Sequence, residues 1–232
     1  MIDTLYTIDF SPFIISLKTG IVATFFAFFL GIFAARLVMR VNRQLKWIID
    51  GIFTLPLVLP PTVAGFFLLL LFSLKRPLGS FLYMNFDIKI VQTWQGCVIA
   101  ACVIAFPLMY RNARAAFEQV DITLIYAGRT LGMSERKIFW KVIIPVAAPG
   151  IASGTILTFA RALGEYVATS MLAGNILGKT RTIAVAISSE VSAGNYSNAG
   201  FWVLVIIIVS FLIVLSINII SGVGTKQVRR WE

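Results

Sequence analysis

The 232-residue chain has 59% apolar residues, 13% charged residues and a mean hydropathy of +0.90. These values exclude an ordinary water-soluble globular protein and place the chain in a lipid bilayer. The sequence contains no histidine, the commonest general base and the commonest metal ligand, so we expect neither a catalytic set nor a metal site. The net charge of +10 is spread over short segments between apolar runs, and we therefore expect no nucleic-acid partner.

Five apolar runs are long enough to cross the hydrocarbon core as helices, which takes about 20 residues each. They are residues 13–38, 48–73, 95–117, 147–172 and 199–223. The sequence therefore predicts an all-α integral membrane protein in which residues 1–232 form a single transmembrane domain. The segments 74–94 and 173–198 are long enough for short helices at the membrane interface. Two cysteines, Cys97 and Cys102, share one apolar run and are interpreted as reduced packing residues.

The basic residues predict the orientation of these spans. Segments 36–46, 111–141 and 226–230 would lie on one side of the membrane and together carry 13 Lys and Arg, whereas the opposite side carries 5. Because positive loops face the cytoplasm, we expect a multi-pass protein of the cell membrane with its N-terminus outside and its C-terminus in the cytoplasm.

The second apolar run contains three prolines close to its middle, in LPLVLPPTVAG (55–65). Each proline removes a backbone donor and restricts the residue before it, so the helix must kink or unwind there. Unwound backbone at membrane depth is tolerated where it is buried or lines a wet cavity. We predict that Pro60, Pro61 and Thr62 line a substrate pathway, and a simple packing kink is the alternative.

Two charges, Arg161 and Glu165, lie inside the fourth apolar run, one helical turn apart. That spacing lets them pair on one helix face. Charges at membrane depth are costly and usually face a cavity or a partner. We predict that Arg161 offers a cation to an anionic substrate while Glu165 moderates its field. The alternative is an ion pair that only fixes helix packing.

Residues 118–146 form a mixed-charge connection that contains YAGRTLGMSERKIFWKVIIP (126–145). This stretch resembles the EAA loop of ABC-importer permeases, in which a Glu-Ala-Ala run precedes a fixed Gly and an Ile-x-Leu-Pro. Tyr126, Ala127 and Gly128 hold the EAA positions, and Gly132 holds that of the fixed Gly. The sequence departs from the pattern at Tyr126, where the family has an acid, and at Gly128.

The segment AGNILGKT (173–180) fits a loose Walker A pattern but is not expected to bind ATP. A phosphate-binding loop needs a preceding strand and a following helix, whereas an apolar run precedes this one. No aspartate follows Asp121, so no acid is available to hold magnesium.

The chain as a whole is similar to molybdate ABC-transporter permeases, a resemblance carried by LPLVLPPTVAG (55–65), AFPLMYRNARAAFEQVD (105–121), RTLGMSERKIFWKVIIPVAAPGI (129–151), and FARALGE (159–165) with the following AGN and GKTRT. The resemblance implies a type I ABC-importer permease with five transmembrane helices and a cytoplasmic coupling helix, roughly Leu131 to Phe139. It implies a homodimer that is not an enzyme and binds no cofactor. A separate pair of ABC ATPase subunits would hold ATP and magnesium, and an extracytoplasmic solute-binding protein would deliver the anion.

The same resemblance implies which residues couple this chain to the ATPase. They are Tyr126, Ala127, Gly128, Leu131, Gly132, Arg136, Lys137, Phe139 and Pro145. Transport would proceed by alternating access, a rigid-body switch between two states. Sulfate or tungstate is the alternative substrate. An ATP-independent secondary transporter or channel is the alternative class of protein, although five spans without an internal repeat are few for such a transporter.

Overall fold

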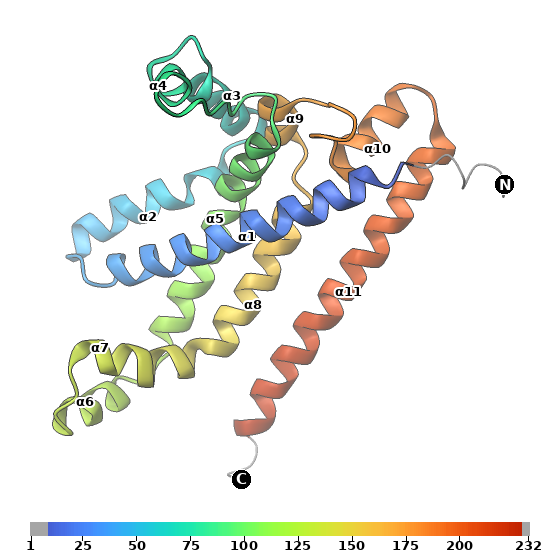
Figure 1. Cartoon of the computed structure of the whole chain (residues 1–232). Coiled ribbons are helices and arrows are strands. Elements are labelled where there is room, and N and C mark those ends of the chain that lie inside the picture. The colour runs from blue at the N-terminus through green and yellow to red at the C-terminus, as the bar shows by residue number, and fades with distance from the viewer. Residues whose placement is uncertain (1–8, 229–232) are drawn as a thin grey trace.

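The computed structural model describes residues 9–228, and among these the side chains of 217–218 and 220–228 are outside the description. Within this part of the chain all regular structure is helical (Figure 1). The helices are α1 (Ser11–Val38), α2 (Arg43–Val58), α3 (Pro61–Phe72), α4 (Pro77–Phe86), α5 (Trp94–Glu118), α6 (Ile122–Thr130), α7 (Glu135–Ile138), the π-helical turn η2 (Phe139–Ile143), α8 (Ile144–Leu163), α9 (Val167–Ala173), α10 (Ile183–Ser192) and α11 (Tyr196–Val228).

Four of these helical segments are long and apolar enough to cross a membrane, and a fifth span results if α2 and α3 are taken together. The four are α1, α5, the continuous helix Glu135–Leu163 and α11. The all-α membrane fold predicted from the sequence is therefore confirmed. Part of the basic tail used to predict the orientation, residues 229–230, lies outside the described residues.

The centre of the molecule is the packing of α5 between α1 and α8. Small residues on facing sides let these helices approach closely, as is usual in membranes, where apolar surface alone does not drive helix association. A Cβ added to Gly31 of α1 would lie 2.8 Å from Met109 of α5, and one added to Gly154 of α8 would lie 2.5 Å from Asn112. The glycines that the sequence places inside these two spans therefore mark close helix contacts.

The second span is broken, as its prolines predicted. Leu59 and Pro60 are extended, and α2 and α3 meet at an angle of 106°. The helix α2 begins earlier than expected, because the Asn42 side chain caps it by accepting a hydrogen bond from the Leu45 N–H at 3.1 Å. None of the residues of α2 is buried within the chain, so this helix lies at the periphery.

The fourth span differs from the prediction at both of its ends. We expected one helix over 147–172, but α8 ends at Leu163 and α9 begins at Val167. At the other end the helix is continuous back to Glu135 through the π-helical turn η2. The reason for the π turn is Pro145, which lacks the N–H that the Lys141 carbonyl would accept in an α-helix and would crowd that carbonyl.

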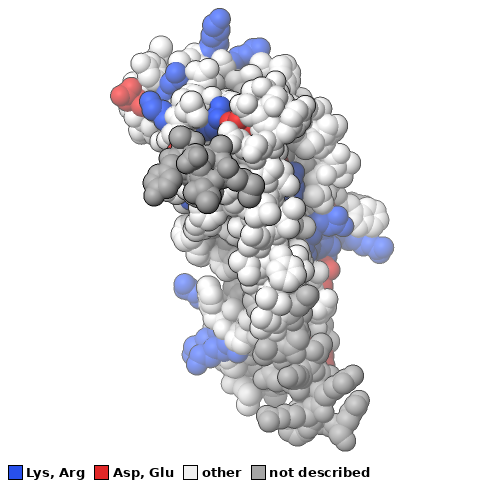
Figure 2. All heavy atoms as spheres, turned by 90° about the vertical axis from the view of Figure 1, so that its right-hand side faces the viewer, with Lys and Arg blue, Asp and Glu red and all other residues white. Residues whose placement is uncertain are grey.

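The short helices gather at two opposite ends of the molecule (Figure 1). One end carries α3, α4, α9 and α10 together with the start of α1, and the other carries the α6–α7 hairpin and the end of α11. Figure 2 shows that Lys and Arg cluster near the first end and reappear toward the second, while the face between them is largely uncharged. This distribution is that of a chain with two polar ends and an apolar belt.

Candidate functional site

The breaks in the second and fourth spans lie next to each other, because α3 packs on α9. A Cβ added to Gly65 of α3 would lie 2.9 Å from the Cα of Ala168 in α9, so the two backbones almost touch there. The sequence predicted the first break from its prolines but missed the second. The features of the sequence that could have indicated the second break are Gly164 and the acid Glu165 within an apolar run.

Glu165 holds the second break together. Its side chain is 2% exposed, and one carboxylate oxygen accepts the Ala168 N–H at 2.8 Å in the first turn of α9. The other oxygen lies 2.8 Å from Nη1 of Arg161 in the last turn of α8. The pair expected from its spacing is therefore present, and it joins the two helices on either side of the gap. The Arg161 side chain is 33% exposed.

The other predicted pathway residues lie at the first break. Pro60 forms the N-terminal boundary of α3, and Pro61 and Thr62 begin that helix. Pro60 and Thr62 are exposed in the single chain and Pro61 is half-buried. Among residues 9–228, the side-chain hydrogen bond of Arg161 goes to Glu165 and not to any of these three residues. The single chain therefore places the two predicted halves of the pathway at neighbouring breaks without joining them.

The predicted coupling segment is a helical hairpin at the end opposite to α4 and α10 (Figure 1). We expected one helix from Leu131 to Phe139, and this boundary is wrong, because residues 131–134 form the turn between α6 and α7. Gly132 has a φ of +71°, and the N–H groups of Gly132 and Met133 bond the carbonyls of Arg129 and Gly128 at 2.9 and 3.0 Å. This pair of bonds is the Schellman motif, which ends α6.

Gly128 is not part of this turn. It lies inside α6, where an added Cβ would sit 3.1 Å from the side chain of Ile138, which is fully buried. The small residue therefore lets α6 close against α7. An ion pair of 2.7 Å between Arg129 and Glu135 ties the same two helices together and raises the pKa of Arg129.

Most of the remaining predicted coupling residues are on the outside of this hairpin. Tyr126 is 53% exposed and Leu131 79%, and Ala127, Arg136 and Lys137 are also exposed. Phe139 instead faces inward, because its ring contacts Phe117 at the end of α5. Pro145 lies beyond the hairpin in α8. The exposed set combines apolar and basic side chains, a composition suited to a protein partner.

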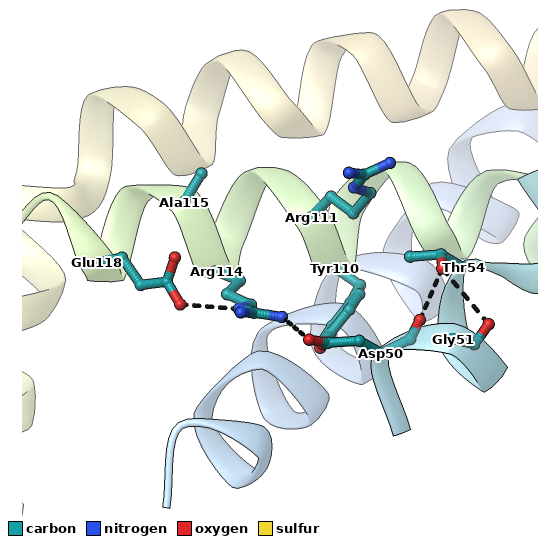
Figure 3. Close-up of a pocket in the computed structure, with 8 residues that line it drawn as sticks. All are labelled: Asp50, Gly51, Thr54, Tyr110, Arg111, Arg114, Ala115 and Glu118. Carbon is teal, nitrogen blue, oxygen red and sulfur yellow. Dashed lines mark hydrogen bonds and ion pairs between the residues drawn. The ribbon is translucent and has the colours of Figure 1, made fainter. Parts of the chain in front are cut away.

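A polar cluster between α2 and α5 was not predicted from the sequence (Figure 3). It lines a cavity of about 430 Å³ and links the two helices through charged side chains. Asp50 of α2 accepts from the Tyr110 hydroxyl and pairs with Arg114, and Arg114 also binds Glu118 at 2.8 Å. Lys46 of α2 reaches the same Glu118 at 3.0 Å. The signal was the spacing of 110, 114 and 118, which puts all three on one face of α5.

The segment AGNILGKT forms a closed turn rather than a phosphate-binding loop. It lies between α9 and α10, and no strand occurs within residues 9–228. The Thr180 hydroxyl accepts the Ile176 N–H at 3.0 Å, and Thr180 is fully buried. The Cys97 thiol is 3.6 Å from the Thr180 carbonyl oxygen, which anchors the turn on α5. The hydroxyl that would bind magnesium in a P-loop is therefore used within the turn itself.

Comparison with known proteins gives the family. The family model described as "Binding-protein-dependent transport system inner membrane component" matches residues 27–230. The chain belongs to this family. It is therefore the membrane component of a binding-protein-dependent transport system and not an enzyme in its own right.

Several relatives of this family member cover most of its length. The putative molybdenum transport system permease protein YvgM of Bacillus subtilis is 38% identical, with 90% of this chain and 92% of the relative covered. The molybdenum transport system permease protein ModB of Escherichia coli is 42% identical, with 77% and 78% covered. The sulfate transport system permease protein CysT of Escherichia coli is 32% identical, with 90% and 75% covered.

A solved structure confirms the fold of this family member. The chain matches an inward-facing conformation of the MetNI methionine ABC transporter with a TM-score of 0.66 over 93% of this chain and 92% of the other, at 19% identity. At that identity the match concerns the fold alone. It confirms the ABC-importer permease fold that the resemblance implied.

Proposed function

We propose that this chain is the membrane-spanning subunit of an ATP-driven importer that translocates molybdate by alternating access. The observation that carries the choice of substrate is the higher identity to YvgM and ModB, 38% and 42%, than to the sulfate permease CysT, 32%. Sulfate remains the second candidate because CysT covers 90% of the chain. Tungstate is grouped with molybdate because the two tetrahedral dianions are nearly equal in size, whereas sulfate is smaller.

The arrangement of the two broken spans supports passage of an anion. A helix break leaves backbone groups without helical partners, and such groups within a membrane require a buried or wet surrounding. Pro60, Pro61 and Thr62 stand at one break, and Arg161 with Glu165 stands at the other. In the homodimer that we propose, a second copy would close these half-sites into one pathway. Binding within it would be weak, since tight binding stalls transport.

The α6–α7 hairpin is the proposed contact with a pair of ABC ATPase subunits. It exposes Tyr126 and Leu131 beside the unpaired cations Arg136 and Lys137 of the described chain, and tight packing of Gly128 on Ile138 makes it rigid. A rigid hairpin can transmit closure of the ATPase pair to α8, because Glu135–Leu163 is one continuous helix. ATP and magnesium would be held by the ATPase, and a solute-binding protein would dock at the opposite end.

The decisive experiment is transport by reconstituted vesicles. Vesicles that hold this chain, its ATPase and its binding protein should accumulate molybdate only with ATP, with tungstate competing and a large excess of sulfate competing poorly. Equal competition by sulfate would assign the chain to the sulfate group. Molybdate movement through the chain without any ATPase would overturn the ATP-driven importer in favour of a secondary transporter or channel.

A further inference from the structure

A cavity of about 520 Å³ opens at the end of the molecule that carries α9 and α10, outside the pathway and the coupling hairpin. Its wall is formed by Ile14, Ile15 and Lys18 of α1, by Trp94 at the start of α5, and by Lys179 of the turn between α9 and α10. Three segments that are far apart in the sequence therefore bring two lysines to one pocket.

The charge of this pocket is positive. No Asp or Glu is among its described lining residues, and neither Lys18 nor Lys179 forms an ion pair within residues 9–228. The cavity between α2 and α5 is different, because two carboxylates lie among its lining residues and both pair with Arg114. Two ammonium groups without a counter-charge on one wall attract an anion.

Both lysines are held in place by contacts of their neighbours. The Lys18 ammonium lies 4.2 Å from the centre of the Trp94 ring, and the Trp94 Nε1 donates to the Thr19 hydroxyl at 2.9 Å, which fixes the ring. Lys179 sits between Gly178, with a φ of +68°, and the buried Thr180 of the closed turn. The GKT part of the Walker-like motif thus positions a cation at the pocket.

An apolar strip continues from this pocket into the membrane belt. Three and seven residues after Lys18, on the same face of α1, Ile21 and Phe25 are 54% and 58% exposed. A free oxyanion gains no favourable contact from such an apolar strip. A phospholipid matches both parts, since lysines and a tryptophan at the membrane interface contact headgroups while the apolar strip contacts an acyl chain.

We propose that this pocket binds an anionic phospholipid, with its phosphate between Lys18 and Lys179 and an acyl chain along Ile21 and Phe25. The proposal is independent of which anion the chain transports and of its ATPase. In the orientation predicted above, the lipid belongs to the outer leaflet. Its binding would fasten the turn after α9, and with it the end of the broken fourth span, to α1.

Native mass spectrometry of the full-length chain in detergent tests the proposal, with phosphatidylglycerol and phosphatidylcholine as probes. The wild type should retain phosphatidylglycerol in preference to phosphatidylcholine. The variant Lys18→Gln/Lys179→Gln should bind phosphatidylglycerol roughly tenfold or more weakly, because each lysine near a lipid surface contributes a severalfold factor. The control Lys75→Gln/Arg76→Gln removes the same charge from the exposed connection at the same end and should bind as the wild type does.

Further measurements test whether the pocket binds a lipid or a free anion, and whether the variants are folded. Thermal unfolding of both glutamine variants verifies that they are folded. If Lys18→Gln/Lys179→Gln does not fold, Lys18→Arg/Lys179→Arg, which keeps both positive charges, should bind phosphatidylglycerol as the wild type does. Inorganic phosphate and molybdate, each added in excess, should not displace the lipid. Displacement by either, or equal loss of lipid in the control variant, would overturn the lipid site in favour of a free-anion site or of diffuse surface charge.

Discussion

The ion pair of Arg161 and Glu165 joins two helices, and we propose that its arginine also attracts the transported anion. Glu165 is nearly fully buried and joins α8 to α9, so removal of Arg161 alone would leave its carboxylate with a single backbone donor. Loss of one member of a buried pair costs about 3–5 kcal/mol, and Arg161 is one-third exposed, so we place the cost at about 2 kcal/mol. A simple loss of transport in Arg161→Leu would therefore confuse stability with anion attraction.

The double variant Arg161→Leu/Glu165→Gln separates these effects. The amide of Gln can still accept the Ala168 N–H, and no charge is stranded. We expect the thermal midpoint to recover most of the loss seen in Arg161→Leu, while molybdate uptake stays several-fold low because the cation is gone. Full recovery of uptake along with stability would assign Arg161 to packing alone.

The cluster around Asp50 predicts a stability effect at a place that the sequence did not single out. Arg114→Gln would leave the Asp50 carboxylate with only the Tyr110 hydroxyl. The helix α2 would then be held mainly by its ion pair with Glu118 and by the partly buried Phe53, which packs against the core. These groups are partly exposed, so we expect a loss of about 1–2 kcal/mol in the free energy of unfolding. Thermal unfolding in detergent measures it. Arg111→Gln is the matched control, because Arg111 extends away from Asp50 (Figure 3) and should change the midpoint little.

At the scale of elements, the contact between α3 and α9 decides whether the two broken spans stay together. Gly65→Ala would put a methyl group 2.9 Å from the Ala168 backbone, which cannot yield without moving a helix. Overpacking of this kind costs about 1–3 kcal/mol. Gly200→Ala, in open space on α11, is the control and should be neutral. If Gly65→Ala unfolds at the wild-type temperature and transports normally, the two breaks are not coupled through this contact.

The hairpin of α6 and α7 gives a second prediction at this scale. Arg136→Glu/Lys137→Glu reverses two exposed charges without touching the packing of Gly128 on Ile138. We expect the chain to remain folded in the membrane but to lose co-purification with its ATPase, since reversed charges on an interface cost several-fold or more in affinity. The reversal Lys75→Glu/Arg76→Glu at the other end should leave ATPase binding intact. Normal ATPase binding by the first variant would contradict the coupling role.

Across the whole molecule, the sequence predicted what depends on local pattern. Apolar length gave the spans, and prolines gave the break at Leu59–Pro60. The break at Gly164–Tyr166 was not predicted because no proline marks it. It depends instead on a contact of the Glu165 side chain with the Ala168 N–H. The polar cluster around Asp50 was not predicted for the same reason, since Asp50 and its partner Tyr110 lie on different helices, sixty positions apart in the sequence. Contacts between distant segments are not encoded in periodicity.

The two polar ends of the molecule allow a direct test of its orientation. Lys75 lies in the exposed connection before α4, and Lys137 lies on the hairpin at the opposite end. With Cys97 and Cys102 replaced by Ala, Lys75→Cys should react with a membrane-impermeant maleimide in right-side-out vesicles, and Lys137→Cys should react only after permeabilisation. The reason is the excess of positive charge on the side that carries 111–141. The reverse pattern of labelling would turn the hairpin away from the ATP of the cytoplasm and would overturn the coupling role of α6 and α7 together with the predicted topology.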